Sequence, residues 1–164
     1  MVFNSYSDLE KEIMRRAESA LKTDVADSVK EKLKEHIEND VYGVYGSMDP
    51  LIYERRKSDG GLLDDKNITS TIDSNNCIGN LMGSTLTVTD KAHIEGPRIA
   101  GYSEQPGKTP LATLLESGKV ENPWTGYRGS WTKARRFISK TQAEVNAHPS
   151  EIADLIRKSI DHRK

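Results

Sequence analysis

The sequence predicts an α+β fold in which a long N-terminal helix packs on a small, mostly antiparallel sheet. Apolar residues recur every four positions across residues 7–40, which indicates a helix. Residues 68–72 and 85–89 alternate in polarity and are rich in β-branched side chains, as strands are. Helical spacing returns in the C-terminal part, so short C-terminal helices and long irregular loops complete the prediction.

The length and charge of the chain limit its class. The chain has 164 residues, 35% of them hydrophobic and 30% charged, which fits a single domain over residues 1–164. Its formal net charge of −1 argues against a dedicated nucleic-acid binder, because such domains are usually strongly basic. Residues 1–82 carry 11 basic and 16 acidic side chains, whereas residues 83–164 carry 13 and 9. Opposite charges in the two halves favour head-to-tail contact between copies, although solvated surfaces also produce such a split.

The sequence predicts a protein of the cytoplasm with no membrane partner. No apolar run approaches the roughly 18 residues of a membrane span. The first residues lack the basic head and apolar stretch of a secretory signal. A single cysteine, Cys77, cannot form an internal disulfide, which suits a reducing compartment.

The first helix is expected to begin at Ser7, which forms a capping box with Glu10. Its apolar stripe keeps a strict spacing of four: Leu9, Ile13, Ala17, Leu21, Val25, Val29, Leu33 and Ile37. An α-helix has 3.6 residues per turn, so each step of four overshoots by about 40° and the stripe winds around a straight helix. A break near Thr23 and Asp24 would reset the phase. One long helix or two consecutive helices are therefore expected over residues 7–40.

The predicted strands form an antiparallel hairpin with one apolar face and one threonine-lined face. Residues 73–76 and 79–80 supply turn chemistry between them. In the next part of the chain, Thr109 and Pro110 open a short helix that Gly118 ends. A second helix is expected from about Lys133 to Val145.

The last helix is predicted to begin at Pro149. One face of this helix carries its apolar residues: Ile152, Leu155, Ile156 and Ile160. Phe137, in the preceding helix, is expected to be buried with Trp124 or Trp131 nearby.

Residues 41–67 form the first candidate interaction segment, an extended assembly loop. The segment has no sustained period and contains four glycines and a proline, and loops of this length are often functional. Its candidate contact residues are Tyr42, Tyr45, Tyr53, Arg55, Arg56, Gly60 and Gly61. Tyrosine and arginine are favoured interface anchors, and adjacent glycines allow a tight turn with positive φ.

A basic cluster is the second candidate, and its members are Arg128, Lys133, Arg135, Arg136 and Lys140. Residues 126–140 contain no acid, and aromatic residues are interleaved with the cations. A single-stranded nucleic-acid groove uses such a mixture. The other interpretation is an amphipathic helix with Phe137 and Thr141 facing inward and its arginines facing solvent or an acidic neighbour.

Catalytic and metal-binding patterns are missing from the sequence. The four histidines are scattered and one cysteine offers no thiolate cluster, so neither a metal site nor a cofactor is expected. Asp64, Asp65 and Asn67 lack the glycine and distal glutamate of a calcium loop and are interpreted as a turn or helix start. No serine elbow or phosphate loop occurs. A metal-dependent nuclease would require the acids of residues 49–65 to converge.

Three ordered segments resemble the minor head proteins of the tailed-phage neck, the tail-completion or head-tail joining class. The first segment contains the tyrosines, Y-E-R-R and G-G-L-L-D of residues 41–68. The second is L-A-T-L-L-E-S-G, residues 111–118, and the third is W-T-K-A-R-R-F-I-S-K-T-Q-A-E-V, residues 131–145. Arg136 stands where that class commonly has proline.

The resemblance implies a non-enzymatic structural protein that forms a homo-oligomeric ring between the head connector and the tail. It implies neighbouring neck proteins as partners: a connector or adaptor, and a tail terminator or tail tube. The basic cluster would face either a neighbouring subunit or DNA in the lumen. The protein would be assembled in the host cytoplasm and reside in a virion or phage-like particle. Two other functions stay open: a small phage-encoded inhibitor of a host or defence protein, and a metal-dependent nuclease.

Overall fold

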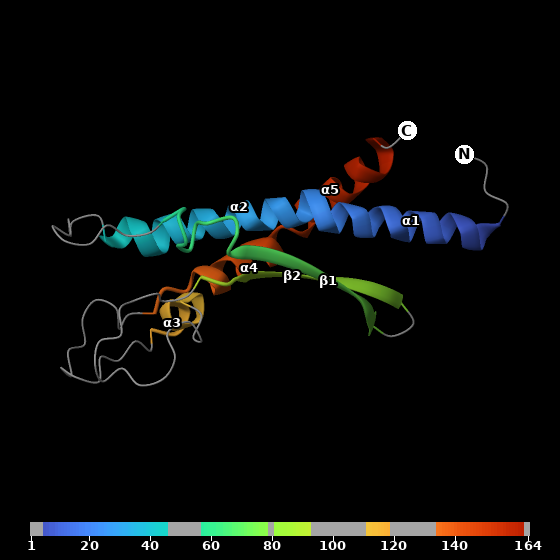
Figure 1. Cartoon of the computed structure of the whole chain (residues 1–164). Coiled ribbons are helices and arrows are strands. Elements are labelled where there is room, and N and C mark those ends of the chain that lie inside the picture. The colour runs from blue at the N-terminus through green and yellow to red at the C-terminus, as the bar shows by residue number, and fades with distance from the viewer. Residues whose placement is uncertain (1–4, 46–56, 79–80, 93–110, 119–133, 163–164) are drawn as a thin grey trace. The chain divides into compact units, whose positions relative to one another are not determined.

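A computed structural model describes residues 5–45, 57–78, 81–92, 111–118 and 134–162 (Figure 1). The elements confirm the predicted α+β class, with a long N-terminal helix, a two-stranded antiparallel sheet and short C-terminal helices. Contacts within the chain divide it into two compact units. Unit 1 contains residues 1–31, 70–88 and 144–164, and unit 2 contains residues 32–69 and 89–143. Among the helices in the described ranges, none has the length and apolar character to cross a membrane.

The first helix, α1 (Tyr6–Ala20), is capped by Ser5 and not by Ser7. The Asp8 backbone N–H donates to Ser5 Oγ at 3.2 Å, and Ser5 Oγ donates to Asp8 Oδ2 at 2.8 Å. A serine followed three residues later by an acid therefore forms the cap, as predicted, but two residues earlier. Ser5 has the extended backbone of an N-cap residue, which leaves Ser7 inside the first turn.

The N-terminal helix contains two π turns. After α1 come a first π turn (Leu21–Val25), α2 (Ala26–Ile37), a second π turn (Glu38–Tyr42) and a short 3-10 turn (Gly43–Tyr45). The first π turn includes Thr23 and Asp24, where the spacing of apolar residues predicted a reset of the helical phase. That prediction is confirmed.

Each π turn compensates the drift of the apolar stripe. Three steps of four residues rotate the stripe by about 120° around an α-helix. A π turn closes its hydrogen bonds five residues apart instead of four, which inserts about one residue, or roughly 100°. One π turn begins at Leu21, three steps after Leu9, and the other follows Ile37, three steps after Val25. Val25, Ile37 and Val41 are all buried.

The hairpin consists of β1 (Ile68–Ile78) and β2 (Leu81–Asp90). Both strands are longer than predicted. Residues 73–76 belong to β1 and do not form a turn, and β2 begins at Leu81, before the predicted residue 85. Cross-strand hydrogen bonding overrides the turn preference of these polar residues. Leu86 and Val88 are half-buried, whereas Thr85 and Thr87 are exposed, so the apolar and threonine-lined faces are confirmed.

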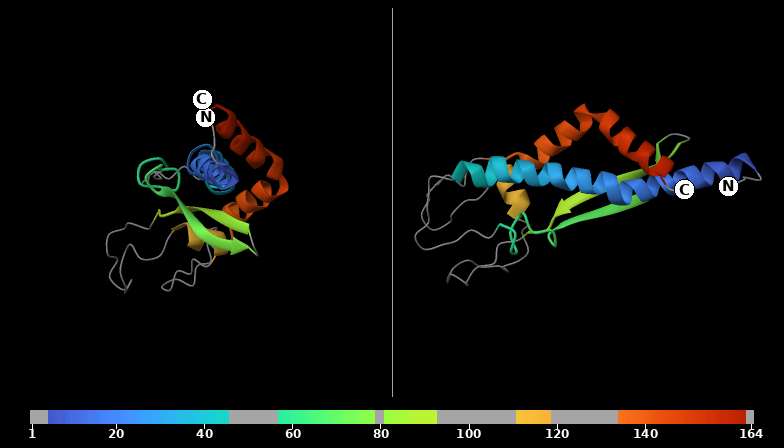
Figure 2. Two further views of the ribbon diagram at one scale, coloured as in Figure 1. Left: turned by 90° about the vertical axis from the view of Figure 1, so that its right-hand side faces the viewer. Right: turned by 90° about the horizontal axis from the view of Figure 1, so that it is seen from above.

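In unit 1, the last helix packs against the first. α5 (Pro149–His162) begins at the predicted proline and lies beside α1 and the first π turn (Figures 1 and 2). Its predicted apolar face, Ile152, Leu155, Ile156 and Ile160, is half-buried. Ser84 Oγ of β2 donates to Glu18 Oε1 of α1 at 3.1 Å, which joins the sheet to the long helix as predicted.

In unit 2, α3 (Leu111–Ser117) and α4 (Phe137–Ala147) supply part of the core. Gly118 ends α3 with a φ of 66°, as predicted, whereas Thr109 and Pro110 lie outside the described residues. Phe137 is completely buried, as expected. The two tryptophans proposed near it, at positions 124 and 131, are also outside the described residues.

Candidate functional site

The second and third segments of the phage resemblance meet where α4 begins. The Arg135 backbone N–H donates to the Leu115 carbonyl at 2.7 Å. The backbone N–H groups of Ile138 and Ser139 donate to the Glu116 carboxylate at 2.9 and 3.0 Å, and the Ser139 hydroxyl donates to it as well. The first N–H groups of a helix lack partners within the helix, and a carboxylate there stabilises the positive end of its dipole. Glu116 therefore caps α4 from α3. We call residues 115–118 and 135–139 the α3–α4 corner.

This cap explains why α4 begins at Phe137 and not at the predicted Lys133. The backbone N–H of Lys140 donates to the Arg136 carbonyl at 2.9 Å, the first bond of the helix. Thr141 Oγ1 donates to the Phe137 carbonyl at 2.8 Å, and both side chains are buried. Residues 134–136 are not helical. The start of α4 is fixed by Glu116, an acid far upstream that no local pattern reveals.

The predicted basic cluster consists of side chains in different environments. Arg128 and Lys133 lie outside the described residues. Arg135 is half-buried, with its Nε fully buried. Lys140 is exposed but ion-paired with an aspartate of the N-terminal helix. Arg136 is exposed on the α3–α4 corner, so the three described members do not form one uniform cationic face.

The partner of Lys140 is Asp40, which lies in the second π turn. Lys140 Nζ is 2.5 Å from Asp40 Oδ1, and His36 Nδ1 is 3.8 Å from Asp40 Oδ2. Asp40 Oδ2 is buried and accepts no hydrogen bond from the described part of the chain. The ion pair ties α4 to the N-terminal helix within unit 2. Lys140 thus has an acidic partner in its own chain.

The predicted assembly loop is tied to the helix end that precedes it. Lys57 Nζ donates to Glu38 Oε1 at 2.9 Å and lies 5.3 Å from the centre of the Tyr42 ring, a cation–π contact. Tyr45 is the last residue of the 3-10 turn. The other aromatic and basic residues predicted in this loop, Tyr53, Arg55 and Arg56, lie outside the described residues.

Residues 57–67, the later part of that loop, are folded into unit 2. Gly60 has a φ of 73°, which confirms the predicted tight turn at Gly60 and Gly61. Asp64 accepts backbone N–H groups from Lys66 at 2.9 Å and from Gly60 at 2.8 Å, and these bonds lower its pKa. Leu62 is only 1% exposed. The glycine pair therefore serves a turn that places Leu62 in the core.

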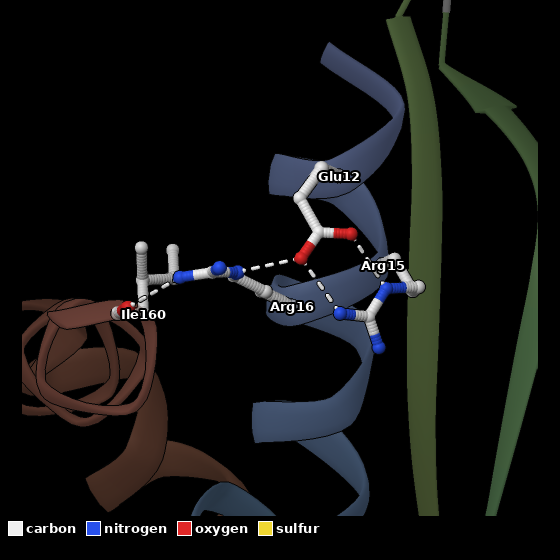
Figure 3. Close-up of polar contacts among 4 residues, drawn as sticks. All are labelled: Glu12, Arg15, Arg16 and Ile160. Carbon is white, nitrogen blue, oxygen red and sulfur yellow. Dashed lines mark hydrogen bonds and ion pairs between the residues drawn. The ribbon is translucent and has the colours of Figure 1, made fainter. Parts of the chain in front are cut away.

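A further polar cluster joins α1 to α5 in unit 1 (Figure 3). Glu12 accepts two bonds of 2.7 Å from Arg15 and one of 2.8 Å from Arg16. Hydrogen bonds from Arg15, and then from Arg16, lower the pKa of Glu12 to about 2. Arg16 Nη1 also donates to the Ile160 carbonyl at 3.0 Å, near the end of α5, where a cation is favourable. The sequence did not single out these residues. The spacing of three and four residues could have indicated the pairing within α1, whereas Ile160 is contributed by the fold.

Asp90, at the end of β2, was not singled out by the sequence. Its side chain is 6% exposed, and Oδ1 accepts the Ala92 backbone N–H at 2.8 Å. Burial raises the pKa of Asp90 to about 6, against the opposing effect of the Ala92 bond. Oδ2 is buried and receives no hydrogen bond from the described residues. The sequence does not distinguish a buried aspartate at the end of a strand from an exposed one, so the burial of Asp90 could not be predicted.

In the described part of the chain, no three histidine, cysteine, aspartate or glutamate residues come together in a way that would hold a metal ion. The acids between positions 49 and 65, which a nuclease would need together, include Asp49 and Glu54. These two lie outside the described residues.

Comparison with known proteins relates this architecture to one family. Neither the curated proteins nor the solved structures give a match. The family described as YomN matches residues 5–161, a range that includes every described helix and strand except the last residue of α5. The match supports a phage-related protein. It does not identify the more specific neck class that the three segments resemble. The chain belongs to the YomN family, a phage-associated family.

Proposed function

We propose that this protein is a non-enzymatic structural component of a phage or phage-like particle, which forms a ring in the neck between the head connector and the tail. Membership of a phage-associated family supports a role in a phage or phage-like particle. The ordered resemblance of residues 41–68, 111–118 and 131–145 to neck proteins supports a location in the neck of that particle. Its partners would be further copies of the chain and the adjacent neck proteins.

The observation that carries the proposal is that hydrogen bonds within unit 2 join described residues on either side of two long stretches of the sequence. The Leu111 backbone N–H donates to the Ala92 carbonyl at 2.7 Å, and residues 93–110 come between these two in the sequence. The Arg135 backbone N–H donates to the Leu115 carbonyl at 2.7 Å, and residues 119–133 come between them.

The composition of these two segments is typical of protein interfaces. They contain both tryptophans of the chain, together with Tyr102, Tyr127, Arg98 and Arg128. Tryptophan, tyrosine and arginine are favoured interface anchors. Segments of this composition suit assembly with neighbouring subunits.

The test is to locate the protein and to remove it. Mass spectrometry of purified particles should detect the chain at a fixed copy number relative to the tail proteins. Particles made without its gene should accumulate as separate heads and tails, and a plasmid-borne copy should restore joining.

Two other results would each replace the proposal. A protein absent from particles, but recovered in a stoichiometric complex with one host protein, is an inhibitor. Nicking of plasmid DNA that depends on magnesium or manganese identifies a nuclease.

A further inference from the structure

The α3–α4 corner presents an exposed cation and an exposed apolar side chain from a backbone that is fixed on both sides. Arg136 is exposed, and Ile138 is 40% exposed. The residue before Arg136 donates its N–H to Leu115, and the N–H of Ile138 is held by Glu116. Side chains on a backbone that is already ordered lose less entropy on binding. The corner therefore has the properties of a preformed contact surface.

We propose that this corner binds a second copy of the chain, with Arg136 against an acidic helix face of that copy. The acidic helix face consists of Asp24 and Asp27. The proposal rests on the proposed function, since it identifies a contact through which subunits would join. Of the three described members of the basic cluster, it assigns the contact to Arg136.

The environment of each described cation separates Arg136 from the other two. Lys140 is neutralised by Asp40 in its own chain. Arg135 is half-buried, and its backbone N–H holds the corner to Leu115, so it belongs to the fold. The side chain of Arg136 has neither an ion pair nor a hydrogen bond with the described part of the chain. Among the described residues, therefore, no acid neutralises its charge.

Charge complementarity identifies the occupant as a second copy. Asp24 and Asp27 are both exposed, and their spacing of three residues places them on one helix face. The side chain of Asp27 is 73% exposed although it lies 3.6 Å from Lys30. Unit 1 contains 9 basic and 12 acidic residues, and unit 2 contains 15 and 13. A basic corner on unit 2 and an acidic face on unit 1 can form the head-to-tail contact that a ring requires.

Charge reversal with rescue tests the contact. Sedimentation velocity of the full chain, across concentration and at low and moderate salt, gives the association constant. Arg136→Glu, and separately Asp24→Lys with Asp27→Lys, should each weaken self-association about tenfold, because like charges are then opposed. The combination of all three changes should restore association to within about threefold of the unmodified protein. Moderate salt should weaken the unmodified protein as well, since exposed charges are screened.

Two controls separate a lost contact from a lost fold. Lys158→Glu reverses an exposed charge on α5 and should leave association unchanged. Thermal unfolding of Arg136→Glu should match that of the unmodified protein, whereas Lys140→Glu should destabilise the monomer through repulsion by Asp40. The proposal is wrong if the combined variant stays weak, or if the unmodified chain is monomeric at every concentration. It is also wrong if Arg136→Glu reduces binding to duplex DNA while association is unchanged. Presence in purified particles would uphold the proposed function in each of these cases.

Discussion

Asp90 shows how the fold changes the chemistry of a single carboxyl group. Its pKa rises from 3.8 to about 6 because the side chain is buried and only the Ala92 backbone N–H stabilises the charged form. The folded protein therefore binds this proton more tightly than the unfolded chain does. Its contribution to stability is complete below pH 4 and is lost as the pH rises through about 6. A shift of this size corresponds to an effect on the order of 2–3 kcal/mol.

Asp90→Asn should remove this pH dependence. Asn Oδ1 can still accept the Ala92 N–H, and the variant does not need to bury a charge at neutral pH. Urea unfolding between pH 4.5 and 7.5 should show the free energy of unfolding of the unmodified protein falling relative to that of the variant. Parallel curves across this range would show that Asp90 is not the group responsible.

Glu116 is the second residue whose role depends on the fold. It accepts the Ile138 and Ser139 N–H groups at the start of α4, and loss of a helix cap typically costs about 1 kcal/mol. Glu116→Ala should lower the free energy of unfolding by about that amount and speed hydrogen exchange at the Ile138 and Ser139 amides. Glu35→Ala removes an exposed acid in mid-helix and is the matched control. Unchanged exchange at both amides would refute the capping role.

At the scale of the elements, the N-terminal helix shows that an apolar spacing of four residues indicates a helix whose phase is reset at intervals. Neither an α-helix nor a coiled coil fits this spacing. The alternation of three α-helical steps with one π turn does fit, and the two π turns occur where the drift has accumulated. The sequence indicated a break near Thr23 and Asp24 that would reset the phase, and the first π turn is the form that this reset takes.

Deletion of Thr23 tests this account of the helix. Removing one residue should convert the first π turn to α-helix and keep the apolar residues on its two sides in the same relative orientation, because the π turn accommodates one extra residue. Deletion of Glu31, in the regular part of α2, should instead rotate the preceding apolar residues by roughly 100° relative to those that follow and destabilise the packing by several kcal/mol. Thr23→Ala keeps the residue count and should change stability by less than about 0.5 kcal/mol. A deletion of Thr23 that lowers the urea midpoint as much as the deletion of Glu31 does would contradict the phase argument.

Other elements differ from their predictions where distant residues decide the outcome. Apolar periodicity gave the existence and type of the helices and strands, because burial of one face requires it. The start of α4 is set by Glu116, and residues 73–76 become strand because β2 pairs with them. Distant residues also decide the environment of the predicted interface residues. Gly60, Gly61, Tyr42 and Lys140 have partners within the chain, which a one-dimensional pattern does not show.

At the scale of the whole molecule, the charge separation is smaller in the structure than in the sequence. Counted over sequence halves, the net charges are −5 and +4; counted over the compact units, they are −3 and +2. The helix residues 32–45 and residues 57–69 bring acids into unit 2, and part of that acidity is neutralised there by pairs such as Lys34–Asp65 at 2.8 Å. Steering by overall charge is thus weaker than the sequence halves suggested. The local contact proposed at Arg136 is expected to matter correspondingly more for the proposed assembly.

The central claim is that copies of this chain form a ring in the neck of a particle. A density map of the intact head-tail junction from electron cryomicroscopy tests this most directly. The map should contain a closed ring between the connector and the tail into which the described α+β fold fits, with each α3–α4 corner against a neighbouring copy. A complete neck that leaves no density for this fold would contradict the claim.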